Sequence, residues 1–127
     1  MSEKNYKNLL EEIIQSNSAI RFTAICGSFG TITEKLQRED VTLLLSEQDT
    51  EKLVGEAIHS WHTRRLYEQK IGKGHYAMAV YDKIIRITIP LNEFQILLVT
   101  LDNTLETPKL IDDIKQILQE SSDIQLE

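Results

Sequence analysis

The chain has 127 residues and a mass of 14.6 kDa, and 41 % of its residues are hydrophobic. This length suits one domain, so residues 1–127 are predicted to form a single domain. No apolar run approaches the roughly 18 residues that a membrane-spanning helix needs, and the net charge of −6 argues against nucleic acid and anionic membranes as partners.

The first part of the sequence predicts a helix followed by a β-hairpin. Apolar residues recur every three or four positions over residues 6–14, which is typical of one face of a helix. The period changes to two over residues 20–26, and residues 31–36 supply a second extended segment. The connection between them contains Gly27 and Gly30, and glycine readily adopts the positive φ angles of tight turns. We therefore expect two antiparallel strands here.

A long helix is predicted in the middle of the chain. Ser46 and Asp49 have the spacing of a capping box, in which the serine side chain caps the first turn of a helix. The helix is expected to extend to Leu66 or Tyr67 and to be the longest element of the fold. Its apolar stripe consists of Leu53, Val54, Ala57, Ile58 and Trp61.

Three further strands are predicted after this helix. They are expected at residues 76–81, 84–89 and 94–101. Pro90 has no amide hydrogen to donate, so it closes the second of these strands. The third strand is apolar at almost every position, which is typical of a strand that is covered on both faces.

The last predicted element is a helix near the C-terminus. Thr107 followed by Pro108 is typical of a helix start, because proline is favoured at the first helical position. Apolar residues between Leu110 and Leu118 form one stripe along it. The tail, residues 121–127, is expected to be frayed.

These elements predict an α+β fold built on a single five-stranded antiparallel sheet. The strand at 94–101 is the most apolar, so it is placed in mid-sheet beside the strand at 20–26, which gives the strand order 2-1-5-4-3. The strands at 31–36 and 76–81 then form the two edges. The long helix is expected to cover one face of the sheet and the two terminal helices the other.

This order of elements resembles that of the roadblock / dynein light chain superfamily, which has a profilin-like fold. The segments that carry the resemblance are the hairpin AICGSFGTITEKL, the helix SEQDTEKLVGEAIHSW and the meander HYAMAVYDKIIRITIPLNEFQILLVTLD. The chain is also similar to small archaeal proteins of this type that have no assigned function. The resemblance implies a non-enzymatic homo- or heterodimer that acts as a scaffold or binds a small GTPase. It also implies pairing through the middle helix and its neighbouring edge strand.

The predicted edge strand at residues 76–81 is the strongest indication of function. It carries neither charge nor proline, so we expect a second copy of the chain to pair with it, unless a loop or the C-terminal tail covers it within one chain. The opposite edge carries Glu34 and Lys35, which oppose such pairing. Trp61, on the adjacent helix, is a residue type that often anchors interfaces. The predicted dimer interface comprises Ile58, Trp61, His62, Arg65, Tyr76, Met78 and Val80.

Side chains that could carry out chemistry are few. His59 and His62 lie three positions apart on the predicted helix and could share a metal ion with His75, but polar surface histidines are the favoured interpretation. Cys26 is interpreted as a small buried hydrophobic residue, since no base is predicted near it. A lone cysteine and a polar N-terminus without a secretory signal predict a cytoplasmic protein. No nucleophile, base and orienting group occur together, so neither enzyme activity nor a cofactor is predicted.

Basic residues are concentrated in one segment of this acidic chain. Six of the 14 lysines and arginines, and all three histidines, lie between His59 and Arg86. Residues 72–74, Gly-Lys-Gly, lack the remaining spacing of a phosphate-binding P-loop and are interpreted as a flexible basic turn. The other candidates are Arg64, Arg65, Lys70 and Lys73. They could meet the acidic helices of a partner subunit or form solvated surface charge, and both interpretations stay open.

The sequence therefore predicts a non-enzymatic interaction or scaffold module that forms a homodimer, with a small GTPase as a candidate partner. The main alternative is a small-molecule sensor with a cavity between sheet and helix, as in PAS-type domains, which share the strand order. PAS-type domains usually have several short helices between the second and third strands, whereas one long capped helix is predicted here.

Overall fold

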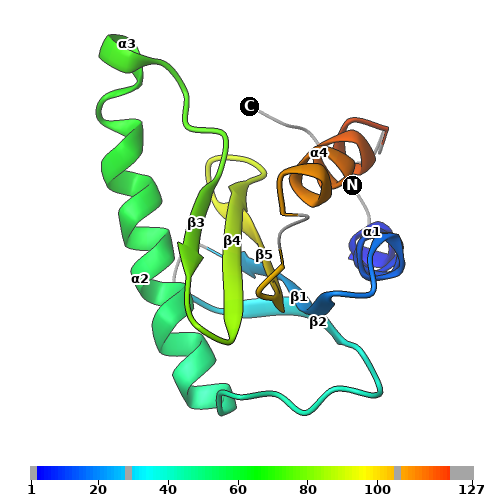
Figure 1. Cartoon of the computed structure of the whole chain (residues 1–127). Coiled ribbons are helices and arrows are strands. Elements are labelled where there is room, and N and C mark those ends of the chain that lie inside the picture. Colours follow the sequence, from blue (N-terminus) through cyan, green and yellow to red (C-terminus); the bar gives the residue numbers. More distant parts are fainter. Residues whose placement is uncertain (1–2, 28–29, 105–106, 121–127) are drawn as a thin grey trace.

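A five-stranded antiparallel sheet with helices on both faces forms the centre of the computed structural model, which describes residues 3–27, 30–104 and 107–120 (Figure 1). In chain order the elements are α1 (Glu3–Ser16), β1 (Ile20–Gly27), β2 (Ile32–Gln37), α2 (Glu47–Arg65), α3 (Glu68–Ile71), β3 (Ala77–Val80), β4 (Ile84–Pro90), β5 (Gln95–Asp102) and α4 (Thr107–Glu120). The strand order is β2-β1-β5-β4-β3, which confirms the predicted sheet.

The central position of β5 explains why the sheet has this order. β5 pairs antiparallel with β1 on one side and with β4 on the other, so that Leu98 lies opposite Ala24 and Thr88. Four consecutive residues, from Ile96 to Val99, are buried. An apolar strand needs cover on both faces, and only an inner position in a sheet with helices on either side provides it.

The two faces of the sheet carry separate apolar cores. On one face α1 and α4 pack against alternate residues of the inner strands, among them Ile25, Ile87 and Val99. On the other face α2 packs against the intervening residues, among them Cys26 and Leu98. Figure 1 shows α2 on one side of the sheet and the two terminal helices on the other, as predicted.

The start of α2 is fixed by its predicted cap. The Ser46 side chain accepts a hydrogen bond from the Asp49 amide at 3.0 Å. With 19 residues, α2 is the longest helix described, and it ends at Arg65. The short helix α3 follows it and was not predicted from the sequence. Its N-cap residue, Tyr67, makes no capping hydrogen bond with its side chain, so α3 has no start signal that the sequence could reveal.

The hairpin of β1 and β2 is confirmed, and its turn lies against α2. Gly27 donates its amide hydrogen to the Thr31 carbonyl at 2.7 Å, whereas residues 28 and 29 of the predicted turn lie outside the described residues. Gly30 has a φ angle of 80°, and a Cβ atom there would lie 3.2 Å from the Gly55 Cα. A glycine at position 30 therefore permits both the turn and its close approach to α2.

The remaining elements differ from prediction by a residue or two. β3 is shorter than the expected segment 76–81, and β4 extends one residue beyond the expected segment 84–89, to Pro90. α4 includes Thr107, which was expected to precede the helix as its cap, and the predicted frayed tail at 121–127 lies outside the described residues. None of the helices in the described ranges combines the length and the apolar character needed to cross a membrane.

Candidate interaction site

The exposed side chains of β3 and its flanks form the main candidate site, which we call the β3 edge. β3 is the outermost strand, and among the described residues it is paired with β4 alone. Four large apolar or aromatic side chains are exposed along it: Tyr76 by 43 %, Met78 by 46 %, Val80 by 59 % and Tyr81 by 48 %. Adjacent apolar residues with this much exposure on an edge strand are unusual for a surface that faces only water.

The register of β3 explains which of its side chains are exposed. Met78 and Val80 lie opposite Ile87 and Ile85, which belong to the core beneath the terminal helices. α1, however, packs over β1 and β2 at the far side of the sheet (Figure 1). The alternate residue Ala77 packs against the core beneath α2. β3 is therefore anchored through Ala77, whereas Met78, Ala79 and Val80 are exposed.

Two predicted interface residues of α2, Ile58 and Trp61, lie inside the single chain. Only 2 % of Trp61 is exposed, and its indole N–H donates to the Thr88 hydroxyl at 2.9 Å. The segment before β3 passes so close that a Cβ atom at Gly74 would lie 2.7 Å from the Trp61 ring. The stripe of α2 found in the sequence is therefore its inward face, and Trp61 joins α2 to β4 within one subunit.

Two other predicted interface residues, His62 and Arg65, lie at the end of α2. The Arg65 guanidinium donates to the backbone carbonyls of Asn92 at 2.6 Å and Glu93 at 2.8 Å, so it ties α2 to the turn between β4 and β5. His62 is exposed and lines a small surface cavity with Arg65 and Phe94. Phe94 is itself exposed and was not among the predicted site residues.

A second set of exposed apolar side chains lies where α2 passes into α3. Leu66, Tyr67 and Ile71 are all exposed, and α3 extends beyond the end of the sheet (Figure 1). Sequence reasoning did not include these residues in the site. The available signal was that none of them continues the inward stripe of α2, so no core position was expected for them.

The side chains considered for catalysis or metal binding are not assembled into such a site. Cys26 is fully buried, and burial raises the pKa of its thiol to about 12, with the positive charge of Arg86 opposing that rise. His59, His62 and His75 are exposed. Within the described ranges, no three His, Cys, Asp or Glu side chains lie close enough together to share a metal ion.

The basic segment is divided between surface and interior. Arg64, Lys70 and Lys73 are exposed, and the Arg64 guanidinium lies 4.7 Å from the centre of the Trp61 ring, within the range of a cation–π contact. Arg86 is buried on the α2 side of the sheet, with 9 % of its surface exposed. It therefore cannot belong to a basic surface strip, and its position follows from the alternation of β4.

The known proteins most informative for this chain are solved structures. No protein-family model matches the sequence. No curated protein matches it either. A Roadblock/LC7 domain from Streptomyces avermitilis matches with a TM-score of 0.67 and 10 % identity, over 87 % of this chain and 89 % of that one.

Two structures of MglB match to a similar extent. Myxococcus xanthus MglB has a TM-score of 0.67 and 10 % identity, over 94 % of this chain and 96 % of that one. A second structure, described as MglB with a tetrameric arrangement, has a TM-score of 0.65 and 11 % identity over 95 % of both chains. The chain thus has the fold of the Roadblock/LC7 domain, as the resemblance of its sequence predicted.

Proposed function

We propose that this protein is a non-enzymatic interaction module that forms a homodimer through the β3 edge and presents the dimer to another protein. The observation that carries this proposal is the exposure of Tyr76, Met78, Val80 and Tyr81 along an edge strand whose outer side pairs with no described strand. Such a strand offers both backbone hydrogen-bonding groups and apolar side chains to a partner. A second copy of the same strand satisfies both, because an antiparallel pair around a two-fold axis is self-complementary.

The contrast between the two edges of the sheet supports this choice of surface. β2 at the opposite edge carries Lys35, whose ammonium lies 3.7 Å from the Glu47 carboxylate. Pairing another chain with β2 would bring these solvated charges into an interface, which costs free energy unless each charge finds a partner. β3 carries no charged residue from Ala77 to Val80.

We assign two roles to the proposed interface residues. Tyr76, Met78 and Val80 contact the second copy, and His62 and Arg65 lie at the rim of the interface. Ile58 and Trp61 do not contact the second copy. They support the interface indirectly, because their burial within one subunit holds α2 and the segment before β3 in place. The tetrameric arrangement described for one MglB structure is compatible with assembly of this fold.

Replacing Met78 with lysine tests the proposed dimer. Met78→Lys places a charge at the centre of the seam, so a wild-type dimer should become a folded monomer in analytical ultracentrifugation at micromolar concentration. The circular dichroism spectrum should stay unchanged, since nearly half of Met78 is exposed within one chain and it lies on an edge strand.

The matched control is Gln37→Lys, which introduces the same charge at the exposed end of β2. This variant should remain dimeric. A monomeric wild-type protein, or a Met78→Lys variant that stays dimeric, would show that the β3 edge is not the seam.

As partner of the dimer we propose a small GTPase, in line with the resemblance of the sequence. Calorimetric titration with small GTPases encoded in the source genome, each loaded with GDP or with a GTP analogue, tests this. We expect binding that differs between the two nucleotide states and that weakens in Met78→Lys. Absence of binding to every GTPase by a confirmed dimer would reject the partner while leaving the dimer intact.

A further inference from the structure

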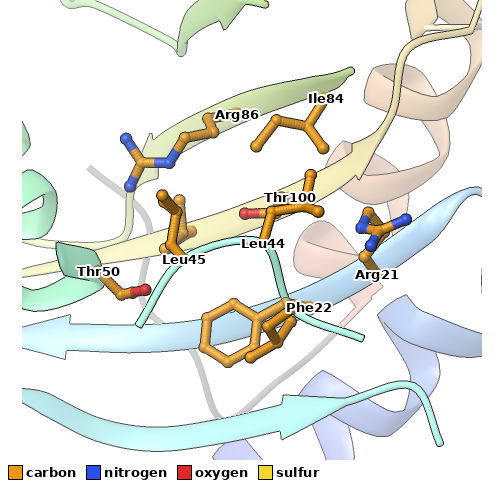
Figure 2. Close-up of a pocket in the computed structure, with 10 residues that line it drawn as sticks. Arg21, Phe22, Leu44, Leu45, Thr50, Ile84, Arg86 and Thr100 are labelled. Carbon is orange, nitrogen blue, oxygen red and sulfur yellow. The ribbon is translucent and has the colours of Figure 1, made fainter. Parts of the chain in front are cut away.

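A cavity on the α2 side of the sheet lies apart from the β3 edge. Strands β1, β4 and β5 form its floor, and the segment at residues 43–45, which precedes α2, forms its outer wall (Figure 2). Its volume of about 30 Å³ corresponds to two or three water molecules or to an acetate-sized group. The residues that matter below are Phe22, Leu44, Leu45, Thr50, Arg86 and Thr100.

The unusual member of this lining is Arg86. It is 9 % exposed, and its Nη2 atom has no hydrogen-bond partner among the described residues. A buried guanidinium nitrogen without an acceptor destabilises the folded state, because its hydrogen bonds to water are lost and no hydrogen bond within the protein replaces them. Desolvation accordingly lowers the pKa of Arg86, and nearby groups, Tyr81 first among them, offset part of this effect.

The second arginine of the cavity, Arg21, has hydrogen-bond acceptors for both of its terminal nitrogens. Arg21 donates to the Asp102 carboxylate at 2.8 Å and to the Thr42 carbonyl at 2.7 Å. Figure 2 shows Arg21 and Arg86 at opposite ends of the cavity, with Leu44 and Thr100 between them. Among the described residues, Arg86 is therefore the arginine of this cavity with a buried nitrogen that has no acceptor.

The chemistry of the walls indicates what that molecule is. Apart from Arg86 and the Thr50 and Thr100 hydroxyls, the walls near the unpaired donor are apolar, among them Phe22 and Leu45. One planar cation in apolar surroundings suits a singly charged, planar anion with an apolar end, since a guanidinium pairs with a carboxylate through parallel hydrogen bonds. A doubly charged phosphate would find too few donors here.

We propose that this cavity binds a short aliphatic carboxylate, held by Arg86 with its chain against the apolar wall. The segment at 43–45 limits the length of that chain. Its neighbours are tethered, because Arg21 bonds to the Thr42 carbonyl and the Gln37 side chain donates to the Val41 carbonyl at 2.8 Å. Acetate and propionate should therefore bind, whereas octanoate should not.

Titrations with sodium acetate, propionate and octanoate, followed by NMR chemical shifts at an ionic strength held constant with sodium chloride, test the proposal. We expect saturable shifts around residues 43–45 and β4 for the two short carboxylates. Arg86→Met should weaken this binding at least about tenfold, as expected for the loss of a charge-assisted hydrogen bond. Arg86→Lys, which keeps the charge but not the planar fork, should weaken it less. The control Arg64→Met, at an exposed arginine, should bind like the wild type.

Stability, measured at one fixed protein concentration for the wild type and the variant, provides a second readout. Without ligand, Arg86→Met should unfold at the same urea concentration as the wild type or a higher one, because methionine replaces a buried charge whose Nη2 atom has no acceptor among the described residues. Acetate should then stabilise the wild type and leave the variant unchanged.

Three results would overturn the proposal. Sodium chloride alone could produce the same shifts, which would indicate an adventitious ion only. The wild type and Arg86→Met could bind acetate equally. Finally, acetate could fail to bind while Arg86→Met weakens the dimer, which would mean that an acidic side chain of a second copy is the partner of Arg86.

Discussion

At the scale of single residues, the interior of this protein shows how polar groups are accommodated by hydrogen bonding. The Thr23 hydroxyl donates to the Leu98 carbonyl at 3.0 Å, the Thr88 hydroxyl accepts from Trp61, and the Thr107 hydroxyl donates to the Thr104 carbonyl at 2.8 Å. Arg86 is the exception within the described ranges, because one of its nitrogens lacks such a partner. A buried donor without an acceptor is a better indication of a ligand than an exposed charge.

The buried thiol of Cys26 leads to a prediction about alkaline pH. Its pKa is raised from 9.0 to about 12 in the folded chain, so above pH 9 the unfolded chain releases a proton that the folded chain retains. Stability is therefore complete below pH 9 and decreases above it, by up to about 1.4 kcal/mol per pH unit from this one group. Urea unfolding at several pH values measures the effect.

The control for this measurement is Cys26→Ala, which lacks the titrating thiol but shares every other group. The stability advantage of the wild type over this variant should narrow as the pH rises above 9. A constant difference would mean that the thiol titrates normally and that its surroundings are less desolvated than the buried position of Cys26 implies.

The sequence predicted the face of a strand or helix on which a residue lies better than it predicted what packs against that face. The alternation of β4 places Arg86 and Thr88 on the opposite face from Ile85, Ile87 and Ile89, but it does not reveal that α2 buries them on that face. Similarly, Trp61 was predicted to lie on the apolar stripe of α2, and the sequence could not say whether that stripe meets the sheet or a second subunit. Both answers depend on the packing of elements distant in the chain.

At the scale of elements, α2 depends on its cap more than the other long helices do. It buries only Val54, Ile58 and Trp61 fully, so its first turn receives little support from packing. Ser46→Ala removes the acceptor for the Asp49 amide and should lower the free energy of unfolding by about 1 kcal/mol. Urea denaturation at neutral pH measures this loss.

The matched control is Ser60→Ala within α2, at a position that is partly exposed. Alanine favours the helix more than serine does, so this variant should be neutral or slightly stabilised. If Ser46→Ala were equally neutral, the cap would contribute nothing and packing alone would fix the start of α2.

The elements that the sequence predicted well are those with strong periodic patterns or caps. α1, α4 and β5 bury their apolar residues as their patterns indicated. α3 was missed because four residues without a cap leave no periodic signal. The shortness of β3 was missed too, since Tyr76 and Tyr81 have high strand propensity whether or not they pair.

At the scale of the whole molecule, one element was enough to determine the order of the sheet. Because β5 is apolar on both faces, it had to be an inner strand, and the short connections between β3, β4 and β5 then left few arrangements. An interface between subunits cannot be predicted in the same way. Its stability depends on a second chain, and the sequence of one chain specifies only which surface is left exposed.

If the protein is a dimer, its thermal stability should depend on its own concentration. Association stabilises the folded state by mass action, so the unfolding midpoint should rise by about 2–4 °C for each tenfold increase in concentration. Met78→Lys should abolish this dependence. Differential scanning calorimetry over a hundredfold range measures it, and a constant wild-type midpoint would contradict the dimer.

The unequal size of the two cores has a consequence for motion within the native state. The sheet and the terminal helices share the larger core, whereas α2 is attached by a few buried side chains, one indole hydrogen bond and the tether of Arg65. Layers attached in this way detach at a lower free energy than the rest of a domain. Amide hydrogens of α2 should therefore exchange with deuterium well before those of β5. A partner bound at the neighbouring β3 edge should slow hydrogen exchange in α2 more than in any other helix or strand.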